Sequence, residues 1–322
     1  MAKVHSTNQR RDFIKKSSLG MVALPFLNFN YRTDFLTKNT NFEPISVSIF
    51  SKHLQFLDYN NMSEAAAEMG FDGIDLTVRH NGHVLPHQVK TDLPKAAQAM
   101  QKAGFAPQIM TTDVTDAKDE DSKILLNTAS DLGFEYYRMG WLKYPEDVSI
   151  PETIKKYHAQ FKDLAALNKS LGLHGGYQNH SGKYIGAAVW DLYQILEGIS
   201  PQWCGSQYDI RHATLEGANS WELGLKLIKD YIKTIVVKDY KWETKNGKTE
   251  MINTPMGEGM VDFKRYFSIL KSYGINVPVI MHFEYGLGGA EHGNSTLTID
   301  KEEVFTKMKK DLAFVRETWK NA

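Results

Sequence analysis

Histidine and carboxylate side chains stand together where apolar runs of this sequence end. The clearest case is His282 and Glu284, which follow the apolar run Val279-Ile280-Met281. Because side chains alternate across a strand, this imidazole and this carboxylate leave the strand on the same side. Asp209 and His212 follow another β-rich segment in a similar way. Such groups can move protons or hold a divalent cation, and the end of a buried strand is where an α/β enzyme carries its catalytic residues.

A repeated connection from a helix to a strand, called a joint below, precedes the β-rich segments that should carry these residues. A helical run ends in a glycine and an apolar residue, as in Gly70-Phe71 and Gly104-Phe105, and a β-rich segment follows. Glycine just past a helix supplies the left-handed cap, and the apolar residue returns the chain to the sheet. Further copies of the joint are Gly133-Phe134, Gly172-Leu173 and Gly274-Ile275.

The joints and the remaining β-rich segments together predict eight strands that alternate with helices. This pattern favours an α/β protein with a (β/α)8 TIM barrel as a single domain over residues 42–322. A doubly wound sheet is less consistent, because no glycine-rich phosphate loop follows the first strand. In a TIM barrel the site must lie at the carboxyl ends of the strands.

Polar residues are dense at those expected strand ends. Any barrel has a polar, solvated rim, so a single polar residue there is not informative. The density of the whole set is what indicates a functional site. His53, His80 and His87 are expected to be surface or loop residues. In chain order the strand ends carry Ser51, Lys52 and His53; Arg79, His80 and His83; Thr111, Thr112 and Asp113; Arg138 and Trp141; Tyr177, Gln178, Asn179 and His180; Asp209 and His212; Lys238 and Asp239; and His282 and Glu284.

Composition excludes several classes of function. The 322 residues carry a formal net charge of zero, so there is no general attraction to nucleic acid or to an anionic membrane. A single cysteine, Cys204, permits no intrachain disulfide and no thiolate metal cluster. A small molecule is therefore the expected partner.

The amino terminus has the pattern of an export signal. Arg10-Arg11 precede the short apolar run Leu19 to Leu27, which is too short to span a bilayer stably. Paired arginines in this position resemble a twin-arginine signal. We expect residues 1–41 to be signal and linker, and the protein to be exported to the periplasm without stable membrane insertion.

Several motifs together resemble the xylose isomerase-like TIM barrels, often called sugar phosphate isomerase/epimerase-like proteins. They are Gln207 to His212, Val237-Lys238-Asp239, Met256 to Gly259 and Phe283-Glu284, and the resemblance extends from Ile45 to Trp319. It implies an enzyme that isomerises or epimerises a sugar. In keto-sugar epimerases of this family, a Glu, an Asp, a His and a Glu on strands five to eight hold a divalent metal that polarises the ketone.

This sequence matches only part of that metal set. Asp209 and Glu284 correspond to the Asp and the last Glu, and His212 corresponds to a substrate-contacting histidine. The strand-five glutamate is replaced by Gln178 or His180, and the strand-seven histidine by Val236.

Two arrangements could compensate for these losses. In the first, which we favour slightly, His282 joins Asp209, Glu284 and Gln178 or His180 around Mn²⁺, Mg²⁺ or Zn²⁺. In the second, the ammonium of Lys238 stabilises the enolate in place of a metal.

The resemblance and the residue types give each candidate a role. The catalytic candidates are Glu284, His180, His212 and Lys238; the substrate-binding candidates are His83, Arg138, Gln178 and Trp141; the metal-binding candidates are Asp209, Glu284, His282 and Gln178.

Three functions remain open at this stage. The first is isomerisation or epimerisation of an unphosphorylated, neutral saccharide through an enolate, and the second is a lyase or hydratase acting on 3-keto glycosides. The third is a sugar-binding barrel without catalysis. A nuclease is disfavoured by the neutral net charge. The long segment Tyr240 to Glu258 is expected to act as a lid or to contact a second subunit, which leaves a homo-oligomer open.

Overall fold

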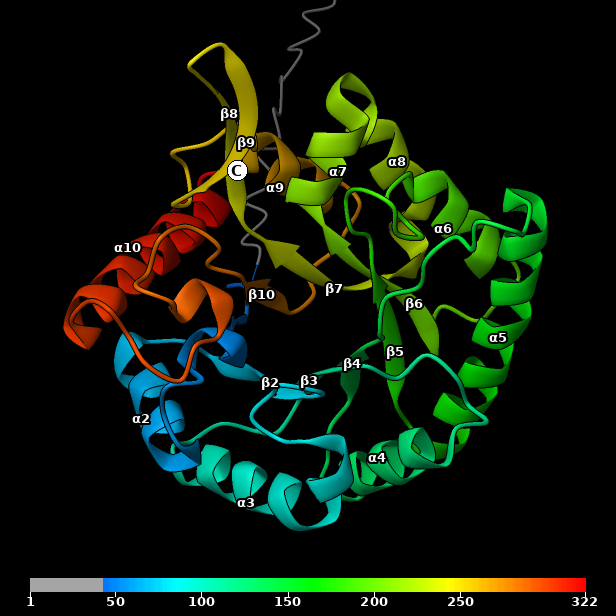
Figure 1. The fold of residues 1–322 in the computed structure, drawn as a ribbon, viewed down its shortest axis with the longest axis horizontal. Coiled ribbons are helices and arrows are strands. Elements are labelled where there is room, and N and C mark those ends of the chain that lie inside the picture. The colour runs from blue at the N-terminus through cyan, green and yellow to red at the C-terminus, as the bar shows by residue number, and fades with distance from the viewer. Residues whose placement is uncertain (1–42) are drawn as a thin grey trace, which may run out of the picture. The chain divides into compact units, whose positions relative to one another are not determined.

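Eight parallel strands form a closed barrel in the computed structural model, which describes residues 43–322. The strand order around the barrel is β1-β10-β7-β6-β5-β4-β3-β2, and helices surround it (Figure 1). The predicted TIM barrel is therefore confirmed. The predicted export signal lies outside the described residues. The strands are β1 (Val47–Phe50), β2 (Gly73–Val78), β3 (Ile109–Thr112), β4 (Tyr136–Arg138), β5 (His174–Gln178), β6 (Cys204–Asp209), β7 (Ile232–Val237) and β10 (Val279–Met281).

The helices begin and end at residues whose chemistry explains the boundary. Asp58 accepts a hydrogen bond from the Asn61 backbone at the start of α2 (Tyr59–Met69), and Gly70 ends that helix at φ 89°. No helix in the described part of the chain is long and apolar enough to cross a membrane. The helices are α2 (Tyr59–Met69), α3 (Val89–Lys102), α4 (Glu120–Asp131), α5 (Ile150–Leu171), α6 (Val189–Leu196), α7 (Ile210–Gly217), α8 (Trp221–Ile228), α9 (Phe263–Ser272) and α10 (Lys301–Lys320).

Two apolar cores support the strands. The larger one fills the space between the barrel and its helices, and includes the buried thiol Cys204. The smaller one lies inside the barrel and consists of Phe50, Ile109, Val236 and Ile280. It closes the barrel interior, so polar side chains nearer the carboxyl ends of the strands rest on an apolar floor.

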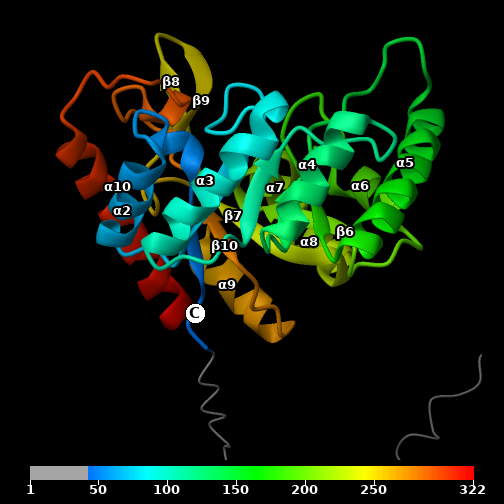
Figure 2. The ribbon, with the colours of Figure 1, turned by 90° about the horizontal axis from the view of Figure 1, so that it is seen from below.

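The long segment after β7 is a β-hairpin. Strands β8 (Asp239–Lys245) and β9 (Lys248–Thr254) pair in antiparallel fashion and project beyond the barrel (Figure 2). Asn246 and Gly247 form its turn at φ 53° and 76°, as a two-residue hairpin loop requires. Asp239 fixes the return to α9, because its carboxylate accepts hydrogen bonds from the backbone of Gly257, Gly259 and Val261.

Candidate active site

Lys238 lies between two carboxylates at the carboxyl-terminal face of the barrel. Its Nζ is 3.2 Å from Asp209 Oδ2 and 3.2 Å from Glu284 Oε1. We call Asp209, Lys238 and Glu284 the lysine centre. The side chains of Lys238 and Asp209 are 3% and 0% exposed, whereas that of Glu284 is 26% exposed. Glu284 is therefore the carboxylate of the three that solvent or a substrate can reach.

The charge of Lys238 governs the ionisation of Glu284. Burial by itself favours the neutral acid, but the ammonium of Lys238 and the neighbouring His282 hold the pKa of Glu284 well below its usual range. Glu284 is thus ionised at neutral pH and can accept a proton.

Gln178 connects the lysine centre to Arg138. Its Nε2 donates to Asp209 Oδ2 at 2.7 Å, and its Oε1 accepts from Arg138 Nη1 at 3.0 Å. Both ends of the amide are engaged, which fixes the orientation of the Asp209 carboxylate. Asp209 also accepts from the His212 backbone N–H at the start of α7.

His180 and His212 pack against each other beside the lysine centre, with ring centroids 4.0 Å apart. His180 Nδ1 donates to the Ser181 carbonyl at 2.9 Å, which leaves Nε2 as an acceptor. His212 Nδ1 accepts from Arg211 Nη1 at 3.0 Å, so the proton lies on Nε2, 3.7 Å from Asp209 Oδ2. Burial, reinforced by the charge of Lys238, lowers the pKa of both rings. Both are neutral at pH 7.

Trp141 adds an exposed aromatic surface to this group. It is 36% exposed, and its ring lies 4.7 Å from His180 and 5.6 Å from Tyr184 between centroids. The guanidinium carbon of Arg138 lies 4.4 Å from the Trp141 ring centre. Partly exposed aromatic rings beside polar groups can stack on the apolar face of a sugar.

The predicted metal ligands lie together but do not fit a metal ion as they are arranged. The ammonium of Lys238 is between Asp209 and Glu284, so a cation can bridge these carboxylates only if the ammonium leaves. The oxygen of Gln178 already accepts from Arg138. No group of three or more His, Cys, Asp or Glu within residues 43–322 is arranged to hold a metal.

His282 has a packing role in this arrangement. It stacks on Phe50 with centroids 4.3 Å apart, and its Nδ1 is 3.8 Å from Glu284 Oε1. Burial lowers the pKa of His282 to about 3. Its neutral ring supports the Glu284 carboxylate on the same side of the chain, as the alternation of the sequence predicts.

His83 lies apart from the lysine centre. Its Nδ1 is within 3.1 Å of the Ser51 hydroxyl and 3.3 Å of the Thr77 hydroxyl, at the ends of β1 and β2. Substrate binding by His83 stays a prediction. His80 is exposed and lies 2.8 Å from Asp113, as expected for a loop residue.

The expectation for His53 is wrong, because its ring is buried. The backbone N–H of Phe283 donates to His53 Nε2 at 3.0 Å, and His53 Nδ1 donates to the Ala290 carbonyl at 3.2 Å. The 3-10 turn Ser51–Leu54 folds the ring inward. His53 thereby ties the end of β1 to the segment that carries Glu284.

Asp75 is a buried acid that the sequence did not mark as a site residue. This acid lies inside the barrel on β2, where the Thr111 hydroxyl donates to it at 2.8 Å. Burial raises its pKa to about 7, although Thr111 and two arginines oppose the shift. Asp75 precedes Thr77 and Val78 within the strand, so its position gave no sign of a site residue.

The hairpin is anchored to the site at its base. Arg211 Nη2 donates to Asn253 Oδ1 at 2.7 Å, and Asn253 Nδ2 donates to the Glu284 carbonyl at 3.3 Å. The hairpin therefore contacts both the α7 and the β10 sides of the lysine centre, and a role as a lid stays a prediction.

Comparisons with known proteins identify the fold. Residues 63–299 match the family model described as xylose isomerase-like TIM barrel. Three similar solved structures are a D-allulose 3-epimerase from Methylomonas sp. (17% identity, TM-score 0.61), a 3-keto-D-glucoside 4-epimerase from E. coli (12%, 0.62) and an IOLI protein with a bound zinc atom (17%, 0.67). Each covers 85% of this chain, and 98%, 99% and 99% of its own chain, respectively. No curated protein sequence matches.

Proposed function

Because this chain belongs to the xylose isomerase-like TIM barrel family, we propose that it is an isomerase or epimerase that moves a proton on the carbon beside the ketone of a saccharide. The structures that it resembles include two epimerases of sugars, which supports a saccharide substrate. The proposal depends on one observation: an ammonium is held beside an accessible, ionised carboxylate.

The lysine centre supplies both charges that enolate formation needs. The carboxylate of Glu284 accepts the proton from the carbon, and the electron pair of the broken C–H bond moves to the ketone oxygen. The ammonium of Lys238 stabilises the negative charge that develops there. Asp209 holds the ammonium in place from the buried side.

The histidines provide a second proton acceptor. His180 is neutral, and its Nε2 is left as an acceptor by the bond from Nδ1 to the Ser181 carbonyl. It can accept a hydrogen bond from a substrate hydroxyl or take up a proton. His212, held by Arg211 and Ser181, can donate from Nε2.

Proton NMR in deuterated water tests this proposal. We expect deuterium to enter a ketose or a 3-keto glycoside beside its carbonyl, and the exchange to survive a chelator. Lys238→Met should slow it by about 10²–10³-fold, the usual cost of losing one oxyanion-stabilising group.

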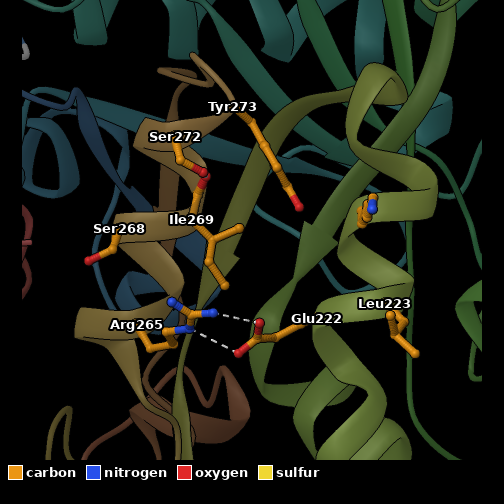
Figure 3. A pocket seen from close by; sticks show the side chains of 8 residues that line it. Glu222, Leu223, Arg265, Ser268, Ile269, Ser272 and Tyr273 are labelled. Atoms are coloured by element: carbon orange, nitrogen blue, oxygen red, sulfur yellow. Dashed lines mark hydrogen bonds and ion pairs between the residues drawn. The ribbon is translucent and has the colours of Figure 1, made fainter. Parts of the chain in front are cut away.

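The matched control is Arg265→Met. Arg265 forms a bidentate ion pair with Glu222 in a groove on the outside of the barrel, between α8 and α9 (Figure 3). Exchange that a chelator abolishes and Mn²⁺ restores would reject Lys238 as the stabilising charge. An unsaturated product would identify a lyase, and absence of exchange with every sugar would favour a binding protein.

A further inference from the structure

Three cations at the carboxyl-terminal face lack the partners that Lys238 has. Lys52 follows β1, Arg79 follows β2 and Arg138 ends β4. We call Lys52, Arg79 and Arg138 the cation group. None of the three has a carboxylate oxygen within 4 Å in the part of the chain that the structure describes, whereas Lys238 has two.

Arg138 is a buried and positioned member of this group. It is 2% exposed, its Nη1 donates to Gln178, and its guanidinium lies against Trp141. Its Nε is buried without a hydrogen-bond partner, and so is Nε of Arg79. A guanidinium that loses water without gaining an anion costs free energy. The fold therefore maintains donors for an anion that comes from outside the chain.

The carboxylates that act on the two arginines compensate only weakly for their charge. Asp75 is buried inside the barrel, and burial raises its pKa to about 7, so it neutralises the two arginines incompletely at neutral pH. Asp113 is exposed and lies 2.8 Å from His80. Burial, with a contribution from Arg79, lowers the pKa of Arg138 to about 10, so the guanidinium is still charged.

The cation group is linked directly to the lysine centre. Gln178 accepts from Arg138 and donates to Asp209, so a single side chain separates the two groups. The charges of Glu284, Lys238, Arg79 and Arg138 all act on the Lys52 ammonium, whose pKa is lowered chiefly by burial. One ligand can therefore contact both groups.

We propose that the cation group binds a carboxylate of the substrate, so that the enzyme acts on a keto sugar acid rather than on a neutral sugar. The planar fork of Arg138 matches the two oxygens of a carboxylate, and Trp141 lies beside it for the sugar ring. This inference rests on the proposed function and revises the neutral substrate that the sequence suggested.

Titration calorimetry with the full chain tests this assignment. D-glucuronate should bind at least about tenfold more tightly than D-glucose or methyl glucuronate, and salt should reduce the difference. Arg138→Met should remove this preference. Arg79→Gln, at a less buried position, should reduce it even if Arg138→Met does not fold, and Arg265→Met should retain it.

The outcomes separate this inference from the proposed function. Equal binding of glucuronate and glucose would overturn the carboxylate site, even if neutral ketoses exchange deuterium. Tighter binding of D-glucose 6-phosphate than of glucuronate would also overturn it. Selective binding of glucuronate without any deuterium exchange would support the carboxylate site and reject the enolate chemistry.

Discussion

Lys238→Met should destabilise the protein strongly, because it removes the counter-charge of a fully buried carboxylate. At 3.2 Å the ammonium and Asp209 attract each other by about 5 kcal/mol with an effective dielectric constant of about 20. Methionine keeps the length of the side chain and removes the charge. Asp209 then retains only neutral donors, from Gln178 Nε2 and the His212 backbone.

We expect the free energy of unfolding at pH 7 to fall by about 3–5 kcal/mol, the usual cost of breaking a buried ion pair on one side. Urea unfolding at pH 7, followed by circular dichroism, measures this loss.

The same experiment on Arg265→Met provides the control. Arg265 and Glu222 form their ion pair on the outside of the barrel, where water replaces the lost interaction, so little change is expected. A loss below about 1 kcal/mol for Lys238→Met would refute the view that Lys238 neutralises Asp209.

Three further predictions concern Lys238, Trp141 and the buried His174. Lys238→Ala leaves Asp209 and Glu284 without their shared cation, so Mn²⁺ should raise the melting temperature of this variant and not that of the wild type; equal shifts would count against it. Trp141→Ala should weaken saccharide binding by about tenfold in calorimetry, with unchanged stability, because a stacked ring contributes about 1 kcal/mol; an unchanged affinity would remove Trp141 from the site. Burial lowers the pKa of His174 to about 4, so stability that is complete above pH 6.5 is lost as the pH falls. Between pH 7 and pH 5 the wild type should lose about 2 kcal/mol that His174→Gln does not lose, measured by urea unfolding.

The sequence was sufficient for the barrel because its signals are local. A glycine in the left-handed region ends a helix wherever it occurs, so Gly70 and Gly172 marked two joints without knowledge of the rest of the fold. The strands of a (β/α)8 barrel are parallel, so their carboxyl ends had to meet at one face. The hairpin was not predicted as a pair of strands. Its turn, Asn246-Gly247, is nevertheless the residue pair that a two-residue hairpin loop typically contains.

The direction of side chains at the site could not be predicted in the same way. Lys238 and Glu284 lie 46 residues apart in the sequence, and only the closed sheet brings them within 3.2 Å. Gln178 was a predicted metal ligand, but its side-chain oxygen accepts a hydrogen bond from Arg138 Nη1. For His53, a short turn after the strand reversed the expected exposure.

The buried thiol makes this chain convenient for optical study. Cys204 is inaccessible, and burial raises its pKa to about 12, so it does not react with thiol-directed dyes in the folded protein. A cysteine introduced at Lys245, next to the exposed hairpin turn, would be the single labelling position. Because Asn253 at the hairpin base bonds to the backbone of Glu284, a fluorophore at position 245 would test whether the hairpin moves when a ligand enters the site.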